Sequence, residues 1–167
     1  MKKNPISVMV IVVVVVFLGF LVNGLSGKAT TADLGDKAKD FSLKDVNGKA
    51  YKLSDYRGKI IVMNFFTTWC GPCLDEAPEL EAFGSEYKDA QFFVLAKGET
   101  TNRVKNYIQK NNSKLIYLLD TKEGTAKNYN VVGQPETIII DGKGVIRKRI
   151  TGPTTKKKLI DIVEKLH

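Results

Sequence analysis

The segment Trp69-Cys70-Gly71-Pro72-Cys73 contains both cysteines of this 167-residue chain. It follows the apolar run Ile60-Ile61-Val62-Met63-Asn64-Phe65-Phe66, which predicts a buried strand, and we expect a helix to begin at the first cysteine. A helix N-terminus carries about half a positive elementary charge and unpaired amide donors, so a thiol there is stabilised as thiolate. Cys70 is therefore the expected nucleophile. Cys73, one turn further along, is the expected shielded thiol that resolves a mixed disulfide.

Two cysteines at this spacing also occur in metal sites, haem attachment sites and static disulfides. Structural zinc takes four Cys or His ligands, whereas this chain has only the two cysteines and His167. Haem attachment requires a histidine directly after the second cysteine, where this chain has Leu74. A static disulfide across so small a loop removes little entropy from the unfolded chain. We therefore expect redox exchange, with no metal and no other cofactor.

The N-terminal segment has the composition of a membrane helix. No charged residue lies between Lys3 and Lys28, and residues 6–22 are apolar apart from Ser7. A helix over these residues can cross a hydrocarbon core of about 30 Å with modest help from its flanks. Lys2 and Lys3 favour a cytoplasmic start.

Signal peptides usually have a shorter apolar region and a small-residue cleavage site close behind it. No Ala-x-Ala follows closely here, so we favour an uncleaved anchor in the lipid bilayer. The expected organisation is a cytoplasmic tip with a transmembrane signal-anchor (1–27), a short linker (28–32) and one domain of ordinary size (33–167). That domain would lie on the extracytoplasmic side of the cell membrane, where disulfides persist.

The charge of the chain points to no particular macromolecule. The net charge of +8 is moderate, and no basic stripe with interleaved aromatic residues indicates a nucleic acid partner. We expect a monomeric protein.

Apolar periodicity predicts an α/β fold with a mixed central sheet flanked by helices. The sheet is expected to be parallel at its start and antiparallel at its end, where Asp141-Gly142-Lys143-Gly144 predicts a hairpin turn. The expected strands are 60–66, 91–96, 115–119, 137–140 and 145–150, and the expected helices run from Cys70 to about residue 83 and over 102–110, 124–129 and 155–166.

The order of these elements, with a proline at Pro135 before a late strand, resembles the thioredoxin fold. More narrowly, residues 41–49 and 53–59 resemble the membrane-tethered thioredoxin-like proteins of the ResA and TlpA group. Their hallmark is CxxC followed by a glutamate and a proline, which here are Glu76 and Pro78. The resemblance implies reduction of disulfides in exported proteins, often apocytochrome c before haem attachment. It also implies a membrane thiol carrier as electron donor.

Glu76 is the third expected catalytic residue. It lies three residues after Cys73 and therefore on the same helical face, a position that also suits an ordinary solvated glutamate. Thioredoxins proper usually have a buried aspartate where this chain has Asn64, and an amide cannot accept a proton at neutral pH. The resemblance therefore implies that Glu76 accepts the proton of the resolving thiol.

The residues around the cysteines are the expected partner-binding surface. The resemblance makes Pro135 a cis-proline facing the cysteines, with the backbone of Gln134 exposed to a partner strand, although a trans turn is far commoner for such bonds. Gln134 and Glu136 stand where relatives commonly have threonine or a small apolar residue, so we expect an effect on partner choice. Trp69 is expected as an aromatic platform, and Gly71-Pro72 is the dipeptide of reducing thioredoxins.

Other functions stay open at the level of sequence. Residues 40–43 and 67–70 loosely resemble the approach of a peroxiredoxin to its peroxide-reactive cysteine, although that family does not usually have a second cysteine three residues on. The protein is alternatively an oxidant for the folding of secreted proteins, or a peptide-binding module without redox chemistry.

Overall fold

The computed structural model describes residues 9–17 and 31–166. Contacts divide the chain into two units, residues 1–30 and 31–167. In the first unit, residues 9–17 form a helix. No helix among the described residues is long and apolar enough to cross a membrane. The remainder of the predicted span 6–22 and residues 28–30 of the predicted linker 28–32 lie outside the described residues, so the anchor stays a prediction.

One seven-stranded sheet forms the centre of the second unit, in the order β2-β1-β5-β4-β3-β6-β7. The central strands β3, β4 and β5 are parallel. β6 pairs antiparallel with β3, β7 pairs antiparallel with β6, and β1 pairs antiparallel with both β2 and β5. The strands are β1 (Ser42–Asp45), β2 (Ala50–Lys52), β3 (Ile60–Phe66), β4 (Ala90–Lys97), β5 (Tyr117–Asp120), β6 (Glu136–Ile140) and β7 (Ile146–Thr151).

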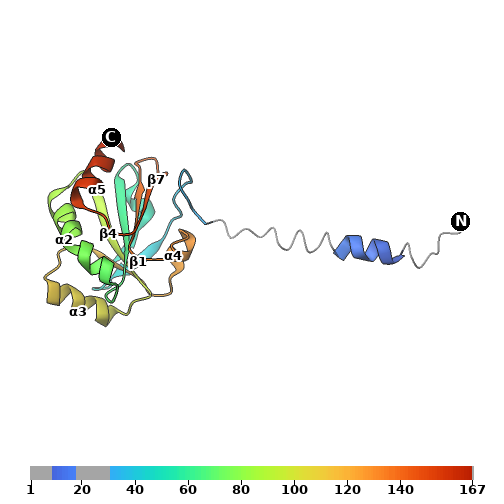
Figure 1. The fold of residues 1–167 in the computed structure, drawn as a ribbon, viewed down its shortest axis with the longest axis horizontal. Helices are drawn as coiled ribbons and strands as arrows, with labels where there is room; N and C mark the ends of the chain where they lie inside the picture. The colour runs from blue at the N-terminus through green and yellow to red at the C-terminus, as the bar shows by residue number, and fades with distance from the viewer. Residues whose placement is uncertain (1–8, 18–30, 167) are drawn as a thin grey trace, which may run out of the picture. The chain divides into compact units, whose positions relative to one another are not determined.

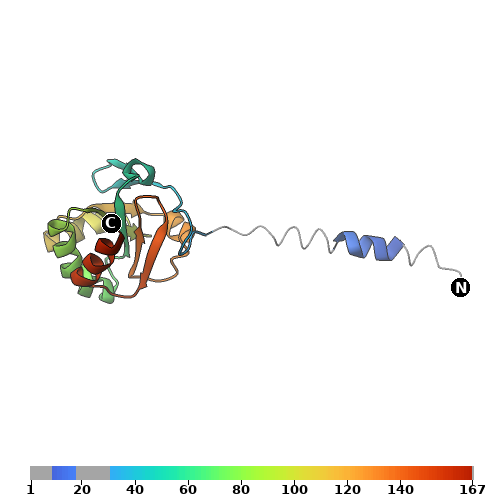
Figure 2. The ribbon, with the colours of Figure 1, turned by 90° about the horizontal axis from the view of Figure 1, so that it is seen from above.

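Helices cover both faces of this sheet. The helices α2, α3 and α5 pack on one face and the short α4 on the other (Figures 1 and 2). Successive residues of β3 point to opposite faces, and all of them are buried because both faces carry a hydrophobic core. The helices are α2 (Gly71–Glu86), α3 (Thr101–Asn111), α4 (Gly124–Asn128) and α5 (Lys156–Val163), and single 3-10 turns cover Leu53–Tyr56 and Glu164–Leu166.

The expected α/β thioredoxin fold is confirmed, and the five expected strands and four expected helices are present with shifted ends. The expectation of a parallel start was wrong for the first two strands, because β1 and β2 form an antiparallel pair that periodicity did not identify. Both are short, and their residues are largely exposed, so they lack a strong apolar run. The last expected helix also ends early, at Val163, and continues as a 3-10 turn.

Asp141 organises the hairpin between β6 and β7. Its Oδ1 accepts hydrogen bonds from the N–H groups of Lys143 and Val145, each at 2.9 Å, and its Oδ2 accepts one from Arg147 Nε at 2.6 Å. The neighbouring Gly142 packs against the backbone of Gly58, where an added Cβ would lie 3.0 Å from the carbonyl oxygen. The turn is therefore fixed both by a buried carboxylate and by a close backbone approach.

We expect Asp141→Asn to lower the free energy of unfolding by about 1 kcal/mol at pH 7. Burial raises the pKa of Asp141, but the hydrogen bonds from Val145 and Arg147 more than offset this effect, so the pKa lies below its usual 3.8. The charged form therefore stabilises the fold above the unfolded pKa of about 3.9, and this stabilisation is lost as the pH falls through the lower folded pKa. Urea denaturation between pH 7 and pH 2 measures the difference.

Asp161→Asn is the matched control. Its ion pair with Lys157 is exposed on α5, so its removal is expected to change stability by no more than about 0.5 kcal/mol. Equal losses for the two variants, or a loss at Asp141 that does not shrink in acid, would contradict the role given to the hairpin carboxylate.

Candidate active site

Cys70 and Cys73 lie where β3 gives way to α2, and they form a disulfide with their Cα atoms 5.2 Å apart. Cys70 is the N-cap of α2, and the N–H of Cys73 points at its Sγ at 3.3 Å. Pro72 occupies the first turn, where the missing N–H has no intrahelical partner to lose. The helix N-terminus expected from the sequence is therefore built around the sulfur of Cys70, where it favours a thiolate.

The two sulfurs differ in their access to solvent. The exposed fraction is 7% for Cys70, whereas Cys73 is completely buried. Large apolar side chains close to the cysteines in sequence are exposed, with exposed fractions of 67% for Trp69 and 40% for Leu74, and Val132, two residues before Gln134, is 86% exposed. Exposed apolar groups of this size are typical of a surface that binds a partner.

The loop before β6 brings Pro135 to the cysteines, although it lies far from them in sequence. The Gln134–Pro135 peptide bond is cis, and the carbonyl oxygen of Gln134 lies 3.7 Å from Cys70 Sγ. The carbonyl of Pro135 accepts a hydrogen bond from the N–H of Gly152 at 2.9 Å. The structure thus brings the predicted Gln134 and Pro135 to the reactive sulfur.

Glu76 is buried, with an exposed fraction of 2%. Its Oε1 accepts a hydrogen bond from Asn64 Nδ2 at 2.8 Å, and its Oε2 accepts one from the N–H of Thr154 at 2.8 Å. Asn64 also donates to Thr137 Oγ1 at 3.1 Å. The solvated glutamate that spacing alone allowed is therefore excluded, because the carboxylate lies inside the fold beneath the cysteines' helix.

Burial raises the pKa of Glu76 above its ordinary value of 4.5, while the hydrogen bonds from Thr154 and Asn64 lower it and offset only part of the effect. A carboxyl with a raised pKa exchanges protons closer to neutrality than an ordinary glutamate does. Because Glu76 and Cys73 share one face of α2, the carboxylate is suited to take the proton of the buried thiol.

Two buried groups that support the site were missed in the sequence. Glu99 is fully buried, and its Oε1 accepts hydrogen bonds from the N–H and Oγ1 of Thr68, at 2.7 and 2.8 Å, so it holds the loop two residues before Cys70. Thr154 supplies the backbone donor to Glu76 from a position just before α5. Neither had a sequence signal, because each depends on a contact between distant segments.

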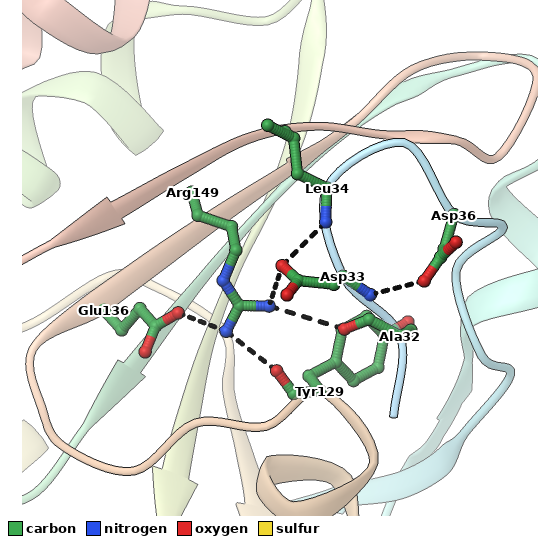
Figure 3. Close-up of polar contacts among 7 residues, drawn as sticks. All are labelled: Ala32, Asp33, Leu34, Asp36, Tyr129, Glu136 and Arg149. Carbon is green, nitrogen blue, oxygen red and sulfur yellow. Dashed lines mark hydrogen bonds and ion pairs between the residues drawn. The ribbon is translucent and has the colours of Figure 1, made fainter. Parts of the chain in front are cut away.

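Glu136 does not face the disulfide. Its buried carboxylate pairs with the guanidinium of Arg149, which also donates to the carbonyls of Tyr129 at 2.8 Å and Ala32 at 3.4 Å and lies 3.6 Å from a carboxylate oxygen of Asp33 (Figure 3). The cluster ties the start of the domain to the strand that follows Pro135. Of the two residues expected to affect partner choice, Gln134 lies beside the sulfur of Cys70, whereas the carboxylate of Glu136 is paired with Arg149 inside the protein.

The site holds two sulfurs, one buried carboxylate and the cis peptide bond of Gln134–Pro135. Among the described residues, no group of three His, Cys, Asp or Glu side chains is placed to bind a metal ion. The chemistry that these groups can perform is thiol-disulfide exchange.

Comparisons with known proteins agree with this geometry. The model of the AhpC/TSA family matches residues 34–149. The thiol-disulfide oxidoreductase ResA of Bacillus cereus is 31% identical over 171 aligned residues, which cover 99% of each chain.

Solved structures give the same result. A thiol:disulfide interchange protein of the DsbE type from Chlorobium tepidum superposes with a TM-score of 0.74 at 28% identity, over 82% of this chain and 100% of that one. The exposed lipoprotein thioredoxin Etrx1 of Streptococcus pneumoniae superposes with a TM-score of 0.70 at 29% identity, over 77% of this chain and 100% of that one. The family match, the relative aligned along nearly its whole length and the paired cysteines together lead to one conclusion: the chain belongs to the AhpC/TSA family and is a thiol-disulfide oxidoreductase with a thioredoxin fold.

Proposed function

We propose that this oxidoreductase reduces disulfides of exported proteins outside the cytoplasm, with apocytochromes c before haem attachment as one substrate class. Residues 6–22 would hold it in the membrane as a monomer with a single span, and the domain 33–167 would work near the outer surface. The uncharged stretch between Lys3 and Lys28 supports the anchor. The similarity to an exposed lipoprotein thioredoxin supports the compartment.

The observation that carries the reductase function is the unequal placement of the two sulfurs. Cys70 is the accessible one and receives the N–H of Cys73, so it is the thiolate that a partner meets first. Cys73 is buried one turn further along α2, and its sulfur is bonded to the sulfur of Cys70. This arrangement separates attack on the partner from release of the partner.

The reaction proceeds in two exchanges that balance. The Cys70 thiolate attacks one sulfur of the partner's disulfide, a mixed disulfide forms, and the partner's other sulfur leaves as a thiolate. Cys73 then gives up its proton and attacks Cys70 Sγ, which releases the second partner sulfur and closes the Cys70–Cys73 disulfide. Two electrons pass from the enzyme to the partner. A thiol carrier in the membrane would return the enzyme to its dithiol form.

Cys73→Ser should trap partners as stable mixed disulfides on Cys70, because the resolving sulfur is absent. We expect exported disulfide-bearing proteins and a membrane thiol donor among the captured species when the full chain is expressed in cells. The captured proteins are identified by non-reducing electrophoresis and mass spectrometry. Cys70→Ser is the matched control and should capture almost nothing, since Cys73 is buried. Capture of cytoplasmic proteins alone would refute the proposed compartment.

Three further measurements separate the reductase from its alternatives. A thiol peroxidase would consume peroxide faster than it exchanges any protein disulfide. A reduction potential well above about −200 mV would instead indicate an oxidant. Retention of the cellular role by a chain without either cysteine would indicate a peptide-binding module.

Glu76→Gln tests the proton transfer. We expect resolution of the mixed disulfide to slow on the order of 100-fold, because glutamine fills the same space but accepts no proton. In the unchanged protein the rate should rise with pH as Glu76 ionises, at a pH above 4.5 because burial raises its pKa. This rise should be absent from the variant, as measured by stopped-flow kinetics from pH 4 to pH 9.

Asp75→Asn removes the adjacent exposed carboxylate and is the control. It should leave both the rate and its pH profile unchanged. If Glu76→Gln behaves like Asp75→Asn across neutral pH, Glu76 is not the proton acceptor.

A further inference from the structure

A groove of about 850 Å³ lies between α2 and α3, and its lining includes the two residues that precede Cys70 in the chain. Trp69, which precedes Cys70, and Thr68 form its near end. The groove is therefore continuous with the surface that meets a partner during the formation of the mixed disulfide. Its far end lies along both helices, at residues that the exchange reaction itself does not use.

The walls of this groove are two regular helix faces. Residues four and seven apart on a helix share one face, and α2 presents Leu74, Pro78 and Glu81 at this spacing. The facing helix α3 presents Arg103, Tyr107 and Lys110 in the same way. Seven residues of helix extend about 10 Å, which matches about three residues of extended chain.

The near end of the groove is apolar and open. The side chains of Trp69 and Leu74 are among the most exposed large apolar groups of the domain, and Pro78 and Tyr107 continue the apolar surface. Removing such groups from water stabilises a complex in proportion to the apolar area buried. An apolar side chain placed between the two helices would gain this stabilisation.

The α3 wall of the groove is positively charged, because Arg103 and Lys110 lie along it on either side of Tyr107. Neither Arg103 nor Lys110 forms an ion pair within the described part of the chain. The carboxylate of Glu81 also lines the groove, but its two oxygens accept hydrogen bonds from Ser113 Oγ and from the N–H of Lys114. The two cations of α3 are thus available to an acidic group of a partner.

We propose that this groove binds an extended segment of the partner protein, adjacent to the partner's reactive cysteine. An apolar side chain of that segment would lie against Trp69 and Tyr107, and a carboxylate two or three residues from the cysteine would meet one of the two cations of the α3 wall, Arg103 or Lys110. The inference rests on the proposed function, since it takes protein disulfides as the substrates. It adds that partners with acidic residues on one side of the cysteine are preferred.

The test uses synthetic peptides whose single cysteine is activated as a mixed disulfide with thionitrobenzoate. The peptides carry Leu-Glu or Leu-Lys two and three residues from the cysteine, on either its N-terminal or its C-terminal side. We expect the reduced protein to react about five- to tenfold faster with the acidic peptide than with the basic one. This preference should hold for one side of the cysteine only, because the groove leaves Cys70 in one direction.

Charge reversal at the groove should abolish or invert the preference. The variant is Arg103→Glu with Lys110→Glu, and the control of equal net charge is Lys148→Glu with Lys158→Glu, at exposed positions that do not line the groove. Both double variants should reduce the neutral bis(hydroxyethyl) disulfide at the rate of the unchanged protein. Only the groove variant should lose the preference for acidic peptides.

The outcomes separate this inference from the proposed function. Reduction of the neutral disulfide without any charge preference would overturn the groove assignment and leave the oxidoreductase intact. Failure to reduce any disulfide would instead overturn the proposed function. A dimer in solution that dissociates on reversal of Arg103 and Lys110 would assign the groove to a second copy of the chain and would also overturn the inference.

Discussion

The buried carboxylate of Glu76 is the interaction on which the active site depends. It joins three elements: Asn64 of β3 donates to one oxygen, the N–H of Thr154 before α5 donates to the other, and α2 carries the residue itself. Burying a carboxylate is costly unless donors satisfy it. Here two donors do so without a neighbouring cation, and for this reason the pKa of Glu76 is raised rather than lowered.

This junction connects the architecture to the chemistry. Glu76 fixes α2 against β3, and the first turn of the same helix contains both cysteines. Because Glu76 lies three residues after Cys73, the two side chains share one face of α2. A hydrophobic residue at position 76 would pack the same elements together. It would leave the N–H of Thr154 unpaired, and it would remove the proton acceptor that we propose for the resolving thiol. Glu76 therefore joins three elements of the fold and, in the proposed mechanism, also takes part in the reaction.

The sequence was most informative where the signal is local. Five consecutive residues encode the two thiols and the helix start, and the long apolar run of β3 encodes the strand before them. Contacts between distant segments could not be predicted. Glu99 accepts a hydrogen bond from Thr68, which is 31 residues away in sequence, and Thr154 donates one to Glu76, which is 78 residues away. No sequence pattern predicts either contact. The short strands β1 and β2 escaped detection because exposed residues interrupt their apolar signal.

The same division explains why the chemistry of this protein is easier to establish than its partners. The reacting sulfurs depend on residues 70–73 alone, whereas the surface around them is assembled from segments near residues 69–78, 103–110 and 132–135. Directly after the last segment, the ion pair with Arg149 holds the carboxylate of Glu136 inside the protein. Val132 is exposed and Gln134 is partly exposed. We therefore expect changes in these segments to alter which disulfide is reduced without changing the thiols, because in the proposed complex the partner's chain crosses these segments.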